Sequence, residues 1–165
     1  MKTISALALL AAVAAADISD IREMYYSAWE MIENGELYTT DLIINSAGKM
    51  YPATGTYGVT LRFHWVISEE NYPDSELLMI TASSVHAAVE QYQEYLYAPD
   101  GELIFHFRSG GYHMNEERFY FTGGVLVRYI ENGTSTDRPD EEASLKGNDA
   151  LHLAGEYLEA FRLLH

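Results

Sequence analysis

The sequence predicts an α+β fold, in which a single antiparallel sheet of about seven strands is accompanied by an amphipathic helix near each end of the chain. Three observations support this prediction: helical spacing of apolar residues near both termini, alternation of apolar and polar residues between them, and glycine-containing turns between neighbouring strands. Because short turns join consecutive strands, the strands should form a meander. Both helices are expected to pack on the same apolar face of the sheet.

The first sixteen residues have the three parts of a secretory signal peptide. Lys2 supplies a positive start, an apolar run extends from Ile4 to Val13, and Ala14-Ala15-Ala16 match a cleavage site. The run is too short to span a bilayer, which needs about 20 residues. A buried N-terminal helix is the alternative. We therefore expect residues 1–16 to be removed, leaving residues 17–165 as a single soluble domain that is secreted or periplasmic, with no membrane insertion after cleavage.

The charge and the absence of cysteine limit the classes of partner. The chain has 25 Asp and Glu residues against 10 Lys and Arg, and its formal net charge is −15. A field of this sign repels phosphate backbones and anionic membrane surfaces, so nucleic acid is not an expected partner. The chain has no Cys, so the fold must be stable without disulfides. A domain of about 150 residues buries enough surface to do so.

An amphipathic helix is predicted near each end of the expected domain. Asp17 or Ser19 should begin the first helix, and Asn34-Gly35 should end it. The last helix should begin near Asn148 or Asp149. The apolar stripes are Ile18, Ile21, Tyr25, Ala28 and Ile32 in the first helix, and Ala150, Leu151, Ala154, Tyr157, Leu158, Phe161 and Leu164 in the last.

Between the helices the apolar residues recur at every second position, which is typical of strands with one buried side. Gly101 and the pair Gly123-Gly124 lie in two of the predicted hairpin turns, where glycine adopts positive φ at little cost. Residues 45–58 and 109–117 are predicted as loops that could form the rims of a site, although Lys49-Met50-Tyr51 could instead extend a strand. The predicted strands are 38–44, 59–67, 77–86, 90–98, 103–107, 119–121 and 125–129.

Motifs for catalysis and cofactor binding are missing from the sequence. It contains no H-E-x-x-H or G-x-S-x-G motif and no glycine-rich phosphate loop. His113 with Glu116 and Glu117 comes nearest to a metal pattern, but zinc needs three or four converging ligands. We therefore predict no catalytic residue, no metal and no cofactor.

Basic and aromatic residues gather at strand positions that alternate with the apolar ones. They include four of the nine Lys and Arg residues outside the signal peptide. Because arginine binds carboxylate, sulfate and phosphate groups through a planar fork, these positions define a predicted binding face. An ordinary solvated sheet face with cross-strand ion pairs is the alternative. The residues of the predicted binding face are Arg62, His64, His106, Arg108, Arg118, Tyr120 and Arg128.

The function that the sequence favours is that of an exported, non-enzymatic binding or interaction domain. Its expected partner is an anionic small molecule, a glycan or a protein. One alternative is a small secreted hydrolase whose acid/base pair is hidden among the many carboxylates. Another is a structural protein that self-associates through an exposed edge strand.

Overall fold

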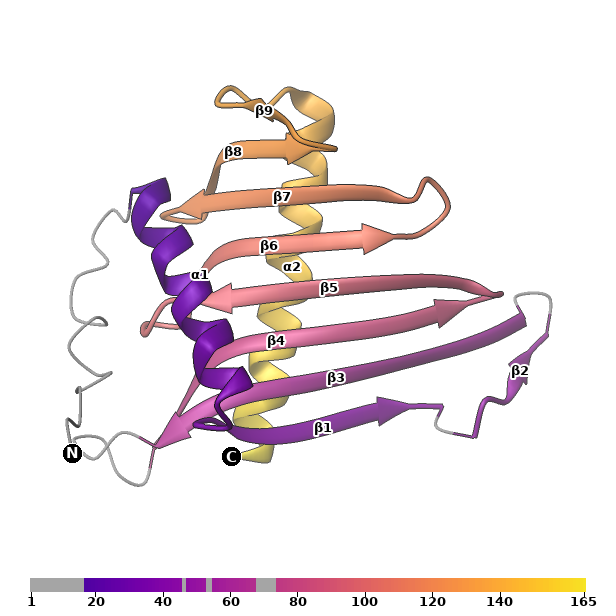
Figure 1. Ribbon diagram of the computed structural model, residues 1–165. Helices are drawn as coiled ribbons and strands as arrows, with labels where there is room; N and C mark the ends of the chain where they lie inside the picture. The colour runs from indigo at the N-terminus through magenta and orange to yellow at the C-terminus, as the bar shows by residue number, and fades with distance from the viewer. Residues whose placement is uncertain (1–16, 46, 53–54, 68–73) are drawn as a thin grey trace.

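The computed structural model describes residues 17–165 except 46, 53–54 and 68–73, so the predicted signal peptide lies outside the described residues. The described chain forms one antiparallel sheet with a helix on each side (Figure 1). The elements are α1 (Ile18–Glu33), β1 (Tyr38–Ile44), β2 (Met50–Tyr51), β3 (Gly55–Ile67), β4 (Ser75–His86), β5 (Val89–Tyr97), β6 (Leu103–Gly110), β7 (Asn115–Thr122), β8 (Val125–Glu131), β9 (Thr134–Thr136) and α2 (Glu141–Leu164).

The sheet is a meander, which confirms the predicted α+β fold class. Its strand order is β1-β3-β4-β5-β6-β7-β8-β9, and β2 pairs with β3 beside this path. The strands beyond the seven predicted are β2 and β9, which have two and three residues. Met50 of β2 lies opposite Thr56 of β3, so part of the predicted 45–58 loop is strand. The predicted turns at Gly101 and at Gly123-Gly124 have positive φ, as expected.

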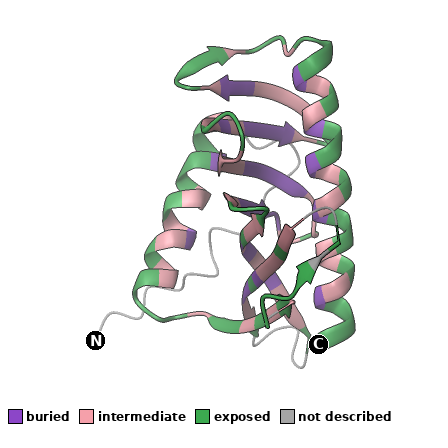
Figure 2. Cartoon of the chain, turned by 90° about the vertical axis from the view of Figure 1, so that its right-hand side faces the viewer, coloured by how far each residue is buried: buried purple, intermediate pink, exposed green. Residues whose placement is uncertain are grey.

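The two helices cover opposite faces of the sheet, which corrects the prediction that both pack on one face (Figure 2). Met79 and Ile80 are consecutive residues of β4, and both are fully buried. Met79 packs in a cluster with Ile21 of α1, whereas Ile80 packs in a cluster with Phe161 of α2. Successive side chains of a strand point to opposite faces. The central strands are therefore buried on both sides, and the apolar run at residues 77–80 is the sequence signal of that burial.

The start of α1 agrees with the sequence. The side chain of Asp17 caps the first turn, and the carboxylate of Asp20 accepts a hydrogen bond of 3.1 Å from the Asp17 backbone N–H. Asn34 ends the helix, and Gly35 follows it with φ of +68°. Positive φ just after a helix is the position that glycine suits best.

The start of α2 differs from the sequence prediction. The helix begins at Glu141 rather than near Asn148, and Asp140 caps it by accepting a 2.9 Å hydrogen bond from the Ala143 N–H. Gly147 lies inside the helix and marks a close approach to β8, because a Cβ there would lie 3.0 Å from Leu126 Cδ2. Within the described residues, neither α1 nor α2 combines the length and apolarity that a membrane span requires.

Candidate binding site

The structure divides the predicted binding face between the two sides of the sheet. A β-bulge causes the division: Leu96 pairs with Phe105, but Tyr97 pairs with Leu103, so β6 has one extra residue. Beyond this bulge Phe105 packs on the α1 side, whereas His106 stacks on Tyr95 of the α2-side core. The α1 side therefore carries Arg62, His64, Arg118, Tyr120 and Arg128, while the α2 side carries His106 and Arg108.

Both histidines of the predicted binding face are buried core residues. Burial lowers the pKa of His64 to about 4, and the nearby Arg62 charge acts in the same direction. Burial also lowers the pKa of His106 to about 3, although its Nδ1 donates a 3.0 Å hydrogen bond to the Glu94 carbonyl. The Nδ1 atom of His64 is buried without a hydrogen-bond partner among the described residues. Both rings are thus neutral in the folded protein near pH 7.

All four arginines of the predicted binding face are paired with carboxylates of the same chain. Arg62 binds Asp41 through two hydrogen bonds of 2.7 and 2.8 Å. Each guanidinium therefore has a counter-charge already, and the pairs of Arg62 and Arg108 cross neighbouring strands, as in the alternative of cross-strand ion pairs. The remaining pairs are Arg108 with Glu117, Arg118 with Glu116, and Arg128 with Asp137.

A cavity of about 950 Å³ lies between the tips of two hairpins, β4–β5 and β6–β7. Both tips lie at the same end of the sheet, on the right of Figure 1, and Figure 2 looks onto that end. We call this cavity the hairpin notch. Its volume falls at the upper end of the roughly 300–1,000 Å³ typical of ligand sites. It is lined by Ser83, Ser84, Val85, Ala88, Val89, Glu90, Gln91, Tyr92, Ser109, Gly110, Gly111, Tyr112, Met114, Asn115 and Glu116.

Close backbone packing fixes the floor of the hairpin notch. The Gly111 N–H donates a 2.8 Å hydrogen bond to the Glu90 carbonyl, which holds the β6–β7 tip against β5. A Cβ at Gly110 would lie 2.5 Å from the same oxygen, and Gly110 has φ of +85°. Only glycine fits both constraints. In the β4–β5 turn, Ala87 and Ala88 have φ of +50° and +75°, a conformation that L-residues adopt only with strain.

The hairpin notch has a mixed lining that exposes more apolar than polar surface, and no Lys or Arg is among its lining residues. Two carboxylates line it, from Glu90 and Glu116. Arg118 stands outside the lining and neutralises Glu116 at a distance of 2.5 Å. Hydroxyl and amide groups make up most of the remaining polar lining. Tyr112 is 73 % exposed at the rim, so its ring is free to meet a ligand.

Tyr92 joins the hairpin notch to a buried carboxyl group beneath α1. Its phenol and the Trp29 indole donate hydrogen bonds to Glu94, and Tyr25 Oη of α1 donates another of 2.7 Å. Burial raises the pKa of Glu94 above its usual range, against the effect of these hydrogen bonds and of the Arg118 charge. Glu94 therefore fixes α1 and one wall of the notch at the same time.

A second cavity, of about 470 Å³, lies on the α2 side of the same β6–β7 hairpin. Its centre is the buried Glu117, which accepts hydrogen bonds from Arg108 and Tyr129 and lies 3.2 Å from Lys146 Nζ. Burial alone would raise the pKa of Glu117, but these partners hold it at about 2. Because the charged groups already neutralise one another, the network serves to fasten α2 to β7.

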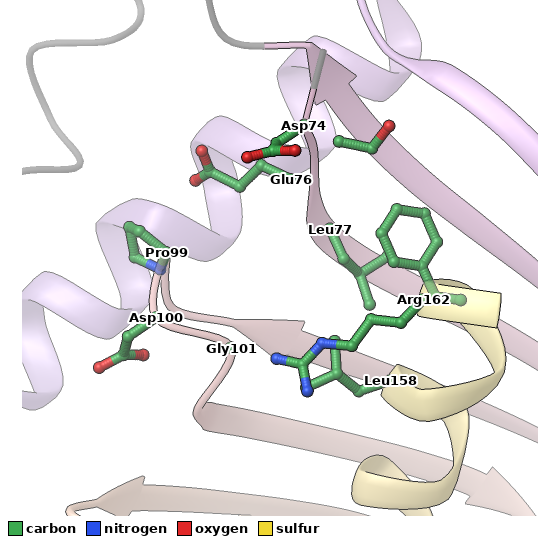
Figure 3. Close-up of a pocket in the computed structure, with 10 residues that line it drawn as sticks. Asp74, Glu76, Leu77, Pro99, Asp100, Gly101, Leu158 and Arg162 are labelled. Carbon is green, nitrogen blue, oxygen red and sulfur yellow. The ribbon is translucent and has the colours of Figure 1, made fainter. Parts of the chain in front are cut away.

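Figure 3 shows a third cavity, at the opposite end of the sheet. Its volume of about 220 Å³ is below the range typical of ligand sites. Asp74, Glu76 and Asp100 are among its lining residues, and the Arg162 guanidinium lies beside Gly101 (Figure 3). In the described part of the chain no group of three or more His, Asp or Glu residues is placed to hold a metal ion.

The sequence pointed to part of the hairpin notch but not to the notch itself. The predicted 109–117 loop supplies Tyr112 and Asn115, whereas no residue of the 45–58 loop lines the notch. No sequence motif marks Tyr92, Ser83 or Glu90 as site residues, because they occupy ordinary strand positions. Only the alignment of two hairpin tips, separated along the chain, brings them together.

The fold and the notch define a class: an antiparallel meander sheet between two helices, with a cavity of mixed polar and apolar lining at one end of its hairpins. Comparisons of the chain with protein-family models, with curated proteins and with solved structures gave no match.

Proposed function

We propose that this protein is an exported, non-enzymatic binding domain whose site is the hairpin notch. The observation that carries the proposal is the lining of the notch, which combines a large volume with polar groups and no cation. A ligand bound there would carry no net negative charge. Export, to the periplasm or the cell exterior, is supported by the signal-peptide pattern of residues 1–16.

The positions of the two buried carboxyl groups favour binding over hydrolysis. Among the described residues these are Glu94 and Glu117, and their pKa values shift in opposite directions. Opposed shifts are what an acid/base pair requires. However, Glu94 hydrogen-bonds to α1 on one side of the sheet, while Glu117 contacts Lys146 of α2 on the other. The two groups cannot act on one substrate from opposite faces.

The absence of cysteine allows the site to be tested by selective blocking. Ser83→Cys places a single thiol in the notch, and Ser135→Cys places one in β9 as a matched control. Each variant is coupled to a bulky maleimide. Thermal unfolding is then followed with neutral oligosaccharides, basic peptides and sulfated sugars, because a ligand at 100 times its Kd adds about 2.7 kcal/mol of stability.

We expect a neutral or basic ligand to raise the unfolding temperature, and we expect the Ser83 adduct, but not the Ser135 adduct, to abolish the shift. Shifts with sulfated sugars alone would contradict the proposal, as would shifts that survive the Ser83 adduct or no shift with any ligand. Chromatography of the incubated ligands tests for turnover. Cleavage of a bound ligand would refute the non-enzymatic part.

A further inference from the structure

We propose that the ligand of the hairpin notch is a neutral oligosaccharide. The inference rests on the proposed function and names its ligand class. Three properties of the notch support it: its small net charge, its mixture of hydrogen-bond donors and acceptors, and its tyrosine rings.

The charge of the notch is small despite its two carboxylates. Arg118 lies 2.5 Å from Glu116 and balances it. Glu90 therefore contributes the unbalanced charge of the lining, and it lies on an exposed rim. One solvated carboxylate attracts a cation by about 1 kcal/mol at contact in water. That attraction is too weak to make a cationic ligand the preferred one.

The hydrogen-bonding groups of the notch suit hydroxyl groups better than ammonium groups. The hydroxyls of Ser83 and Ser109 can both donate and accept, whereas the amides of Gln91 and Asn115 already have partners within the chain, in Gln93 and in Glu131 and Asn132. A sugar hydroxyl also donates and accepts, so it can pair with either serine in either sense. An ammonium ion donates only, so it cannot accept a hydrogen bond from these serine hydroxyls.

Two tyrosine rings supply apolar contact for the carbon faces of a sugar. Tyr112 is 73 % exposed at the tip of the β6–β7 hairpin. Tyr92 is held from behind by its hydrogen bond to Glu94 and by an edge contact with Phe107. One ring is thus fixed in place and the other is free to close on a ligand. Tyrosine combines a flat apolar body with a polar tip, which suits a ligand with both kinds of surface.

The test measures binding of uncharged oligosaccharides by an array and then by calorimetry, using the folded protein and four variants. Tyr112→Ala should weaken binding by roughly threefold to tenfold, since it removes an aromatic contact, and Tyr112→Phe should restore it. Tyr26→Ala is the matched control, because Tyr26 is 68 % exposed on α1, away from the notch. Glu90→Gln should change the affinity for a neutral sugar by less than about threefold, because Gln keeps a hydrogen-bonding side chain.

The possible outcomes separate the ligand class from the proposed function. Binding of basic peptides that Glu90→Gln abolishes, with no binding of neutral sugars, would overturn the oligosaccharide and leave the binding site in place. Sugar binding that Tyr112→Ala does not change would also overturn it. If nothing without net negative charge binds, the proposed function and the ligand class fail together.

Discussion

Tyr25 Oη in α1 donates a 2.7 Å hydrogen bond to Glu94 Oε2 in β5, which joins residues 69 positions apart in the sequence. The carboxyl group is buried, and the helix, the sheet and a wall of the hairpin notch meet at it. Burial raises its pKa, so ionisation of Glu94 costs more in the folded protein than in the unfolded chain. This contact therefore stabilises the fold most fully at low pH.

Glu94→Gln should be more stabilising, or less destabilising, at pH 8 than at pH 5. The folded pKa of Glu94 lies above its unfolded value, so the wild-type protein loses stability as pH rises from the unfolded pKa through the folded one. Gln does not ionise and escapes this loss. Urea unfolding at both pH values measures the difference, with Glu159→Gln on the exposed surface of α2 as the control. If the difference in unfolding free energy between Glu94→Gln and the wild type did not change with pH, the raised pKa of Glu94 would be contradicted.

The two buried histidines should make the protein less stable as pH falls. Their folded pKa values are about 4 for His64 and about 3 for His106, below the usual 6.5. Stability is therefore fully present above pH 6.5 and is lost as pH falls through the folded values. Between pH 6.5 and pH 5 the expected loss is about 2 kcal/mol for each histidine, from about 1.36 kcal/mol per pH unit.

His64→Leu should remove about half of this pH dependence, and it should also remove the unpartnered Nδ1 atom from the core. His152→Leu controls for the loss of a histidine, because His152 is exposed on α2. Chemical unfolding at pH 5 and pH 7 gives the slope of unfolding free energy against pH for each protein. If His64→Leu keeps the wild-type slope, the titration of His64 is not the cause.

The Glu117 network should contribute more stability than any surface ion pair of the sheet. Glu117→Gln leaves Arg108 and Lys146 without their shared buried carboxylate. We expect a loss of roughly 2–3 kcal/mol, somewhat below the roughly 3–5 kcal/mol for a fully buried pair, since both cations keep contact with water. Arg118→Gln is the comparison, because its pair with Glu116 is substantially exposed and should contribute roughly 0–1 kcal/mol. Equal losses in urea unfolding would show that burial of Glu117 does not matter.

The helices and most strands could be predicted because long periodic segments specify them. The face of the sheet on which a side chain lies could not be predicted, because β-bulges change the alternation of side chains along a strand. In β6, Ile104 and Phe105 are consecutive, yet both pack on the α1 side. Strict alternation would place Phe105 on the α2 side together with Leu103, and His106 and Arg108 on the α1 side. The prediction therefore assigned His106 and Arg108 to the wrong side of the sheet. No local residue pattern marks this bulge, which depends on the pairing with β5.

The hairpin notch escaped prediction for a related reason. Its walls come from the β4–β5 and β6–β7 tips, which approach each other only when strand lengths and registers are fixed. The start of α2 was predicted near Asn148 or Asp149, but the helix begins at Glu141, so Gly147 lies inside it rather than before it. Within the fold Gly147 allows close contact with Leu126 instead, which is a tertiary constraint that the sequence does not display.

Changing the two central residues of the β4–β5 turn should make the protein more stable. Ala87 and Ala88 both have positive φ, which costs roughly 1–2 kcal/mol for each non-glycine residue. Replacing them with Asn-Gly, the preferred pair for this kind of turn, should stabilise the protein by at least about 1 kcal/mol. The reverse exchange, Gly123-Gly124→Ala-Ala, should destabilise it by a similar amount, since no backbone crowds either position. Thermal unfolding of both variants tests the two predictions together. A change of unfolding temperature in the same direction for both variants would contradict this account.

The two glycines inside α2 should respond differently to alanine. A Cβ at Gly155 would meet nothing within 4 Å, so Gly155→Ala should stabilise the helix by roughly 0.5–1 kcal/mol through a lower entropy of the unfolded chain. A Cβ at Gly147 would lie 3.0 Å from Leu126 Cδ2, so the same gain should be lost to crowding against β8. Unfolding temperatures of the two single variants give the comparison directly. If Gly147→Ala stabilised the protein as much as Gly155→Ala, the packing of α2 on β8 would not be close enough to require glycine.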